Sequence, residues 1–500
     1  MTAKKWFLVV AAASLLFINA APAPAYASST PYESYNYNYW EEAVPAPAAY
    51  VPGRVISGKD LGVGDFVEPA DMVVDGNGLV YVVDSGNNRI VRIDEKWQVQ
   101  DVISGFSNDG KEDGFKNPTG MYVDGDGMMY IADTDNGRVV ILDKDGSLIR
   151  FIEQPKSDIL ASDFKFAPLK VTVDKAKRVF VIAQGMFEGI MQFDPDGEFI
   201  GFVGTNKVQR DYTEFFWRLF STKAQKAQMI LFIPTEFSNI DIDAKGFVYA
   251  TNIDPGSQEP VKRLNPSGED VLKRYGYFHV KGDILYRLSV GPSKLIDVKV
   301  QDNGMYSVLD SNQGRIFTYN DEGDLLYVYG GKSNQAGTFK TPVAIESAGD
   351  SRLVLDRGKS NIVLFKPTKF GLKVNEAVTL HHNGEDKQAV PVWEEVLRLN
   401  SNYDIAYIGI GKSLLMEKRN KEALEYFKLG MDRDGYSVAY KRYRREFMKE
   451  HFGNFLSVLV ALAAAWFAFK LYRMVSRKRK LKLNKPAAGG GPNIGEGKAL

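Results

Sequence analysis

Short runs of alternating apolar and polar residues recur along most of the chain, and many of them end in a turn rich in Gly, Asp or Asn. One run, YVVDSGNNRIVRI at residues 81–93, returns as YIADTDNGRVVIL at residues 130–142 and as YSVLDSNQGRIFTY at residues 306–319. Alternation with a period of two predicts half-buried β-strands. Its return at intervals of tens of residues predicts a repeat architecture.

A proline opens each copy of the repeat and precedes an alternating strand, a turn such as Asp75–Gly78, and further strands. The six prolines are Pro69, Pro118, Pro168, Pro234, Pro292 and Pro342. Units of four short strands arranged in this way predict an all-β, six-bladed propeller over residues 53–372.

The two ends of this repeat region fit together. The sixth unit runs into a helical pattern without a fourth strand, whereas Val55–Gly58 precedes the first unit and matches Val102–Gly105, the expected outermost strand of the first blade. We therefore expect Val55–Gly58 to complete the sixth blade, which closes the ring and removes an exposed edge.

The units resemble the NHL repeat, whose pattern is a proline, an alternating strand, an Asp-x-x-Gly turn, Tyr-Val-Ala-Asp and Asn-x-Arg-Ile. The first, second and fifth units match it best. The resemblance implies a propeller that binds protein or RNA, although the fold overlaps with calcium-dependent lactonases and an amidating lyase, so fold constrains function weakly. The architecture is similar to that of anchored NHL-repeat proteins of Gram-positive bacteria, which implies partners in the envelope or in sugar transport.

An Asp followed five residues later by an Arg recurs in three units. The pairs are Asp84 and Arg89, Asp133 and Arg138, and Asp310 and Arg315. One interpretation is a ring of charges that binds a ligand around a central mouth. The other is structural, with the Asp shaping a turn and the Arg serving as its partner. Repetition favours the structural interpretation, because catalysis needs one site and not several alike.

Metal chemistry has few candidate residues. The chain has no cysteine and four histidines, of which only His279 falls in the propeller, so a multi-His or Cys zinc site is excluded. Calcium stays open, because turns such as Asp124–Gly127 offer oxygens, although none has the Glu that an EF-hand loop needs at its twelfth position. We expect no cofactor and a binding function. The alternative is a lactonase-like, calcium-dependent hydrolase of the gluconolactonase type acting on the axis.

An insertion between the third and fourth units breaks the strand pattern. Within residues 210–232, aromatic side chains recur at helical spacing, including Phe215, Phe216 and Phe220, with Trp217 beside them. This pattern predicts an amphipathic helix. It either docks on the propeller or binds a partner, and the sequence leaves both open.

A helical pattern follows the propeller over residues 373–450 and resembles a tetratricopeptide repeat. The matching positions are Tyr407, Ile410, Gly411, Leu414, Ala423, Phe427 and Gly430. About one and a half units are present, fewer than the three that a solenoid normally needs. A stalk and a peptide-binding groove are therefore both consistent with the sequence.

Both ends of the chain carry apolar runs. Lys4 and Lys5 precede one that leads to small residues at 25 and 27, which predicts a signal peptide over residues 1–27. Residues 452–469 carry no charge and predict a transmembrane helix over residues 452–472. Eight Lys and Arg residues follow this helix, so residues 473–500 should be a basic, disordered cytoplasmic tail.

The remaining segment, residues 28–52, is rich in Tyr and Pro without periodicity and is predicted to be a linker. The overall charge of +1 hides an acidic body between basic ends. An acidic body argues against nucleic acid as a partner. Together these features predict a single-pass cell-membrane protein whose N-terminal bulk is extracytoplasmic and binds an envelope or membrane protein.

Overall fold

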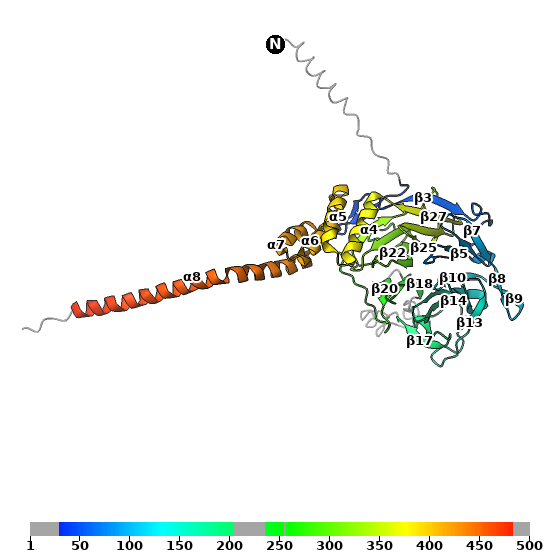
Figure 1. Cartoon of the computed structure of the whole chain (residues 1–500), viewed down its shortest axis with the longest axis horizontal. Coiled ribbons are helices and arrows are strands. Elements are labelled where there is room, and N and C mark those ends of the chain that lie inside the picture. Colours follow the sequence, from blue (N-terminus) through cyan, green and yellow to red (C-terminus); the bar gives the residue numbers. More distant parts are fainter. Residues whose placement is uncertain (1–29, 205–235, 255–256, 258, 278, 484–500) are drawn as a thin grey trace, which may run out of the picture.

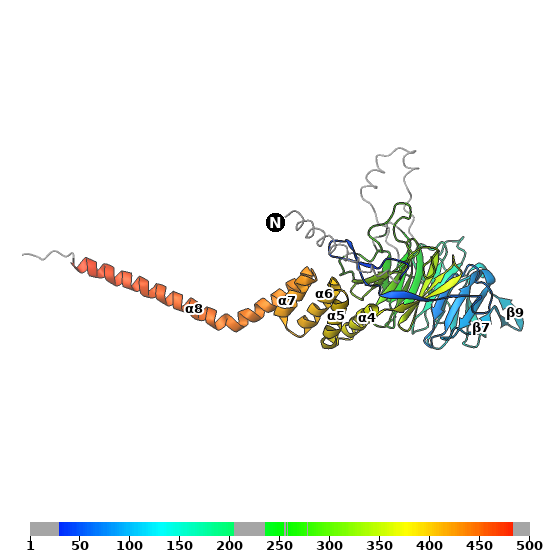
Figure 2. The same ribbon diagram turned by 90° about the horizontal axis from the view of Figure 1, so that it is seen from above.

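Six antiparallel sheets surround a central axis, and a row of helices leads away from one side of this propeller (Figures 1 and 2). The structure is a computed structural model, and it describes residues 30–204, 236–254, 257, 259–277 and 279–483. The predicted six-bladed propeller is confirmed.

The first three blades each have four strands in sequence order from the axis outwards. Blade 1 consists of β4 (Asp71–Val74), β5 (Val80–Asp84), β6 (Arg89–Ile93) and β7 (Val99–Ile103). Blade 2 consists of β10 (Pro118–Val123), β11 (Met129–Asp133), β12 (Arg138–Leu142) and β13 (Leu148–Ile152). Blade 3 consists of β14 (Pro168–Val173), β15 (Val179–Ala183), β16 (Ile190–Phe193) and β17 (Phe199–Val203). A hairpin of β8 (Gly105–Asn108) and β9 (Lys111–Gly114) joins blades 1 and 2.

The other three blades are less regular. Blade 4 has β18 (Phe237–Ile242), β19 (Val248–Asn252) and β20 (Val261–Leu264), and within the described residues its fourth strand is reduced to a bridge between Leu264 and Asp270. Blade 5 has β21 (Leu295–Val300), β22 (Tyr306–Asp310), β23 (Arg315–Tyr319) and β24 (Leu325–Tyr329). Blade 6 has β25 (Pro342–Ala348), β26 (Ser351–Asp356), β27 (Asn361–Pro367) and β3 (Tyr50–Ser57).

The second strand of each blade is almost entirely buried. All five residues of β5 are buried, as are those of β11 and β22, because each second strand lies between the faces of two neighbouring blades. The turns before these strands need a left-handed residue, which Gly78 supplies at φ 82°. Local alternation and turn chemistry therefore set the repeat that the sequence shows.

Strand β3 closes the ring as predicted. It pairs antiparallel with β27, with Val55 opposite Val363 and Ile56 opposite Ile362. Ile56 is fully buried, whereas Val55 beside it is exposed. The first and last parts of the propeller sequence thus form one blade, and the outer edge of β27 is covered.

The segment predicted as a linker differs from that prediction over residues 30–52. Strands β1 (Tyr35–Tyr37) and β2 (Ala43–Pro45) form a hairpin, and β1 adds to β24 of blade 5, with Tyr35 opposite Val328. Tyr32 and Tyr50 are buried against the propeller. Tyrosine rings carry enough apolar area to order this segment, and Tyr alternates with Asn over residues 35–39, a strand signal that the linker prediction overlooked.

The helical region begins at residue 369, slightly before the predicted boundary. Its helices are α4 (Lys369–His382), α5 (Asp386–Leu399), α6 (Asp404–Met416), α7 (Asn420–Leu429) and α8 (Arg433–Leu483), and each packs on the next. Glycines allow the close contacts: a Cβ atom on Gly409 would lie 2.5 Å from Trp393, and one on Gly411 would lie 2.9 Å from Phe427.

The propeller and the helices share one hydrophobic core. Tyr327 of blade 5 and Phe365 of blade 6 belong to the same buried cluster as Phe370, Trp393 and Tyr403 of the helical region. The Tyr403 hydroxyl also donates a hydrogen bond of 2.7 Å to the Leu326 carbonyl. The helices α4 to α7, hereafter the neck, are therefore packed onto the propeller and not joined to it by a free linker.

Helix α8 continues from the neck into the charge-free run at residues 452–469, which is exposed along its length. Within the part of the chain that the structure describes, it is the one helix long and apolar enough to cross a membrane. Residues 473–483, predicted as the start of a disordered tail, instead continue α8 up to Leu483. Three predicted features lie outside the described residues: the signal peptide, the tail from residue 484 on, and the helix at 210–232 with Phe215, Phe216, Trp217 and Phe220.

Candidate functional site

The first predicted Asp–Arg pair forms at the end of β5. Asp84 is fully buried, and its Oδ1 accepts a hydrogen bond of 2.7 Å from the Val67 backbone N–H. Its Oδ2 accepts from Asn87 Nδ2 and from Arg89 Nε, both at 2.8 Å. The carboxylate therefore holds the turn after β5 against the loop that enters the blade. We call this arrangement the turn latch.

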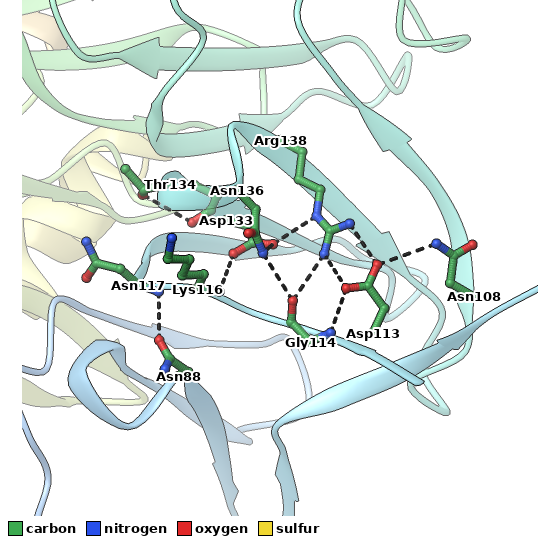
Figure 3. Close-up of polar contacts among 11 residues, drawn as sticks. Asn88, Asn108, Asp113, Gly114, Lys116, Asn117, Asp133, Thr134, Asn136 and Arg138 are labelled. Carbon is green, nitrogen blue, oxygen red and sulfur yellow. Dashed lines mark hydrogen bonds and ion pairs between the residues drawn. The ribbon is translucent and has the colours of Figure 1, made fainter. Parts of the chain in front are cut away.

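The same latch recurs in blade 2 (Figure 3). Asp133 accepts from the Lys116 backbone N–H at 2.7 Å, and from Asn136 Nδ2 and Arg138 Nε at 2.9 Å. Arg138 also makes a bidentate pair with Asp113 of β9, at 2.8 and 3.0 Å. The Arg138 hydrogen bonds lower the pKa of Asp113 to about 2. This latch therefore fixes the β8–β9 hairpin on blade 2 as well.

Blade 5 breaks the pattern. Asp310 Oδ1 accepts from the backbone N–H groups of Lys294 and Asn312, at 2.9 and 2.8 Å, but no bond joins Asp310 to Arg315. Arg315 Nη1 instead donates to the carbonyls of Glu33 and Gly330, at 2.8 and 2.7 Å. The structure thus forms two of the three predicted pairs and splits the third. Ligand binding by the ring stays a prediction.

Loss of a latch should destabilise its blade. Asp133→Ala removes the acceptor of three N–H donors and should lower the free energy of unfolding by about 2 kcal/mol. Asp135→Ala, at an exposed position of the same turn, is the matched control and should change it by less than about 0.5 kcal/mol. Urea unfolding of the detergent-solubilised chain, followed by tryptophan fluorescence, measures both. Equal losses in the two variants would contradict the role of the latch.

A cavity of about 580 Å³ lies on the propeller axis and is lined by the innermost strands of all six blades. It reaches the ends of these strands at Asp75 and Asp124, where the Asp-Gly turns begin. Its polar lining comes from alternate residues of the inner strands. Those that carry the network described next are Asp71, Lys170, Asn239, Asp241, Asp297, Lys299 and Glu346.

The axial aspartates accept hydrogen bonds from backbone N–H groups of neighbouring blades. An innermost strand has no ladder partner on its axial side, so its N–H groups need other acceptors. Three aspartates each accept a hydrogen bond from the inner strand of the next blade. These bonds are Asp71 with Met121 at 3.2 Å, Asp241 with Val300 at 2.8 Å, and Asp297 with Ile345 at 2.6 Å. These aspartates join neighbouring blades at the axis.

Two lysines neutralise part of this acidic lining. Lys170 Nζ lies 2.9 Å from Asp71, and Lys299 Nζ lies 3.1 Å from Glu346 and 3.5 Å from Asp241. Asp71 is therefore paired with the Lys170 ammonium group, and Asp241 and Glu346 share the Lys299 ammonium group. Within the described residues, no group of three or more His, Asp or Glu side chains is placed to hold a metal ion.

Burial sets the ionisation of the axial acids. It raises the pKa of Asp297 to about 7 and, despite the nearby Lys299, raises the pKa of Glu346 to about 8. Burial alone would lower the pKa of Lys299, but the Asp241 and Glu346 carboxylates outweigh it and raise that pKa. Near neutral pH the network therefore holds protons that an unfolded chain would release.

This proton uptake predicts a pH-dependent stability. The ordinary pKa values are 3.8 for Asp and 4.5 for Glu, so the folded state binds more protons from about pH 4.5 up to pH 8. The stability that protonated Asp297 and Glu346 contribute is complete below the pKa values of these groups in the unfolded chain. It is lost as the pH rises through their pKa values of about 7 and 8 in the folded protein. We expect the free energy of unfolding to fall by roughly 4–5 kcal/mol between pH 5.5 and 8, because each of the two protons contributes about 1.4 kcal/mol per pH unit until its group ionises.

The variant Glu346→Gln should flatten this dependence, because it removes one titrating group from the network. Glu198→Gln, at an exposed turn of blade 3, should keep the dependence of the unaltered chain. Urea unfolding at pH 5.5, 7 and 8 measures the free energy of unfolding of the unaltered chain and of both variants as a function of pH. A stability that rises over this range would show that the assigned protonation is wrong.

The sequence does not predict the axial network, although charged residues inside the predicted inner strands are a signal of it. Units three and five place Lys170 and Lys299 at strand positions where alternation predicts a regular core, and Asp297 stands in the same strand as Lys299. These departures from the repeat mark the residues that meet on the axis. One sequence does not show that residues of different blades converge.

A family model for the NHL repeat matches residues 66–93, which span β4 to β6 of blade 1. Blade 1 carries an NHL repeat. A search of curated protein sequences finds no significant match to this NHL-repeat propeller.

Solved structures resemble the NHL-repeat propeller at low identity. Virginiamycin B lyase from Staphylococcus aureus is 11% identical over 63% of this chain and 99% of its own, with a TM-score of 0.40. A structural genomics protein of unknown function from Bacteroides thetaiotaomicron is 14% identical over 61% of this chain and 70% of its own, with a TM-score of 0.41. At these values the likeness says nothing about a reaction or a ligand.

Proposed function

We propose that this protein is a membrane-anchored, extracytoplasmic NHL-type propeller that binds a partner in the cell envelope and acts as a scaffold. The observation that carries the proposal is the shared core of propeller and neck, followed without a break by α8. A helix with an exposed, charge-free run of 18 residues is unfavourable in water and fits a bilayer. The neck would then hold the propeller in a fixed orientation above the membrane.

The charge pattern supports an outward-facing propeller. Eight Lys and Arg residues lie at residues 470–485, directly after the apolar run, and the N-terminal segment has the features of a cleaved leader. Both signals favour export of everything before residue 452. On this proposal the partner is an envelope or membrane protein, with a sugar-transport system as one candidate.

For the tetratricopeptide-like segment we propose a stalk in place of a peptide groove. Trp393 and Tyr403, on its inner side, are buried in the core shared with the propeller. Beside them, between Glu322 and Lys412, only about 20 Å³ of cavity is left. A peptide needs an open groove, and this face is already filled by blade 5.

The second candidate is the lactonase-like hydrolase on the axis. It is favoured by one observation, two acids with pKa values near 7 and 8 beside a cavity of about 580 Å³. We rank it below the binding function, because lysines take the places beside Asp71, Asp241 and Glu346 that a calcium ion would need. Assays of lactone hydrolysis with and without calcium, comparing the unaltered chain with Glu346→Gln, test it. Calcium-dependent turnover that the substitution abolishes would favour the hydrolase.

The experiment that tests the scaffold is crosslinking in native membranes followed by identification of the co-purified proteins. A variant lacking residues 210–232 examines whether the aromatic segment with Phe215, Phe216, Trp217 and Phe220 contributes. We expect a specific membrane protein to be recovered with the unaltered chain and its yield to fall at least several-fold with the deletion. Recovery of no partner with either chain would overturn the scaffold proposal. Protease added to intact cells should cleave the propeller side of the protein.

A further inference from the structure

A second, larger cleft lies between the N-terminal segment, the loop at residues 283–290 and the turn that follows Asp310. Its volume is about 1280 Å³, compared with about 580 Å³ for the axial cavity. The repeat pattern of the sequence does not predict this cleft, because one of its walls is formed by residues that precede the propeller sequence. The side chains that give it its chemistry are Tyr35, Tyr37, Asp283, Arg287, Arg315 and Lys332.

One wall of the cleft is aromatic and held in place. The rings of Tyr35 and Tyr37 meet edge to face, with centroids 5.6 Å apart. Both hydroxyls donate to Asp283, the Tyr37 bond being 2.9 Å long. Because burial and Asp283 raise the pKa of both hydroxyls, the tyrosines stay neutral donors. A wall whose rings are already fixed loses little entropy when a ligand packs against it.

The rest of the cleft is positively charged. Within the described residues, none of Arg287, Arg315 and Lys332 has a carboxylate in ion-pair range, whereas the latch arginines do. Asp283 already accepts two tyrosine hydroxyls, and Glu33 adds one carboxylate to the lining. Three cations against two acids leave a net positive charge. A ligand with negative charge of its own is therefore favoured in this cleft.

Arg315 connects the two parts of the cleft. Its guanidinium lies 5.2 Å from the centroid of the Tyr35 ring, and its Nη1 is held by the carbonyls of Glu33 and Gly330. The departure of Arg315 from its latch partner Asp310 thus places a fixed cation beside the aromatic wall. In blades 1 and 2 the corresponding Arg89 and Arg138 are paired with their aspartates, so neither offers a cation without a carboxylate partner.

We propose that this cleft binds an acidic glycan. Sugar rings would pack against the partly exposed Tyr35, whose position the buried Tyr37 supports, and carboxylate or sulfate groups of the glycan would pair with Arg287, Arg315 and Lys332. The volume exceeds the roughly 300–1,000 Å³ of sites for single small molecules, which fits an oligomer. This inference names a ligand for the proposed binding module and rests on that function. Calorimetry tests the cleft alone, whereas co-purification tests the scaffold, so one can fail without the other.

Isothermal titration calorimetry on the detergent-solubilised full chain tests the cleft. The probes are a galacturonate hexamer, a sulfated hexasaccharide, a neutral galactose hexamer and a hexaglutamate peptide. We expect at least one acidic glycan to bind saturably, the neutral glycan to bind at least ten-fold more weakly, and the affinity for the acidic glycan to fall with added salt. Equal or tighter binding of the peptide would overturn the glycan assignment, as would absence of binding by both acidic glycans.

Substitutions locate the binding. Arg287→Ala and Lys332→Ala change exposed side chains, and each should weaken binding of the acidic glycan by about ten-fold, the effect of losing one charged hydrogen bond. The matched control is Lys245→Ala, an exposed lysine in a turn of blade 4, which should leave the affinity unchanged. Circular dichroism confirms that the variants are folded. Affinities that are equal in all three variants and the unaltered chain would place the binding elsewhere and overturn the proposal.

Discussion

Replacing Ile56 by Asp should lower the free energy of unfolding by about 4 kcal/mol or more, because it buries an unpaired carboxylate in the strand that closes the ring. Ile56 is fully buried in β3, opposite Ile362 of β27. A charge at this position would separate β3 from β27 and leave the edge of blade 6 uncovered. Urea unfolding and thermal melting of the solubilised chain measure the loss.

The chain offers a matched control on the same strand. Val55 is the neighbour of Ile56, pairs with Val363, and has 38% of its surface exposed. Val55→Asp introduces the same carboxylate on the exposed side and should lower the free energy of unfolding by less than about 1 kcal/mol. If the two variants lose equal stability, or if Ile56→Asp is neutral, then β3 does not close the propeller.

The predictable part of the fold depends on contacts between neighbouring residues of the repeat. Alternation and the Asp-Gly turns show the strands of blades 1 and 2, and the match of Val55–Gly58 to Val102–Gly105 shows the closure. Each of these signals is local, or it compares two copies of one local pattern. Blade 4 is the exception, because among the residues that the structure describes its fourth strand is reduced to a bridge that its proline and turns do not reveal.

The N-terminal hairpin shows where a local signal ends. Tyr35 pairs with Val328, almost three hundred residues later. Tyr and Asn alternate over residues 35–39, which is a strand signal, but this local pattern does not show which sheet edge the strand joins. Its stability comes from the outer edge of β24 and from buried tyrosine rings. The same long-range packing moves Arg315 away from Asp310, because the Glu33 carbonyl and the Tyr35 ring receive its guanidinium. A sequence motif predicts the pair, and tertiary packing decides it.

The candidate sites follow the same division. The latches of Asp84 and Asp133 are predictable, since each Asp and its Arg are five residues apart in one hairpin. The axial network is assembled by residues of different blades, such as Asp241 and Lys299. The cleft beside Tyr35 is formed by three segments that are far apart in the sequence: the N-terminal segment, residues 283–290 and the turn after Asp310. Both arise from the closed ring, so their chemistry is visible only after the blades are placed.

The other large expected effect concerns the attachment of the neck. Tyr403 is buried between α6 and blade 5, where its ring packs edge to face on Phe370 with centroids 5.4 Å apart, and its hydroxyl bonds to Leu326. Tyr403→Ala should lower the free energy of unfolding of the neck by about 4 kcal/mol, the usual loss for a buried aromatic side chain. Tyr403→Phe removes the hydrogen bond alone and should lower it by about 1 kcal/mol.

The functional consequence separates this variant from a simple loss of stability. If the neck orients the propeller on the membrane, Tyr403→Ala should leave the blades folded but expose the chain between β27 and α6 to protease. Limited proteolysis in membranes should then release a propeller fragment at least ten-fold faster than from the unaltered chain. Tyr407→Ala, at a partly exposed position of α6, is the control and should not change the rate. Fast release from both variants, or from neither, would mean that the shared core does not hold the propeller to its anchor.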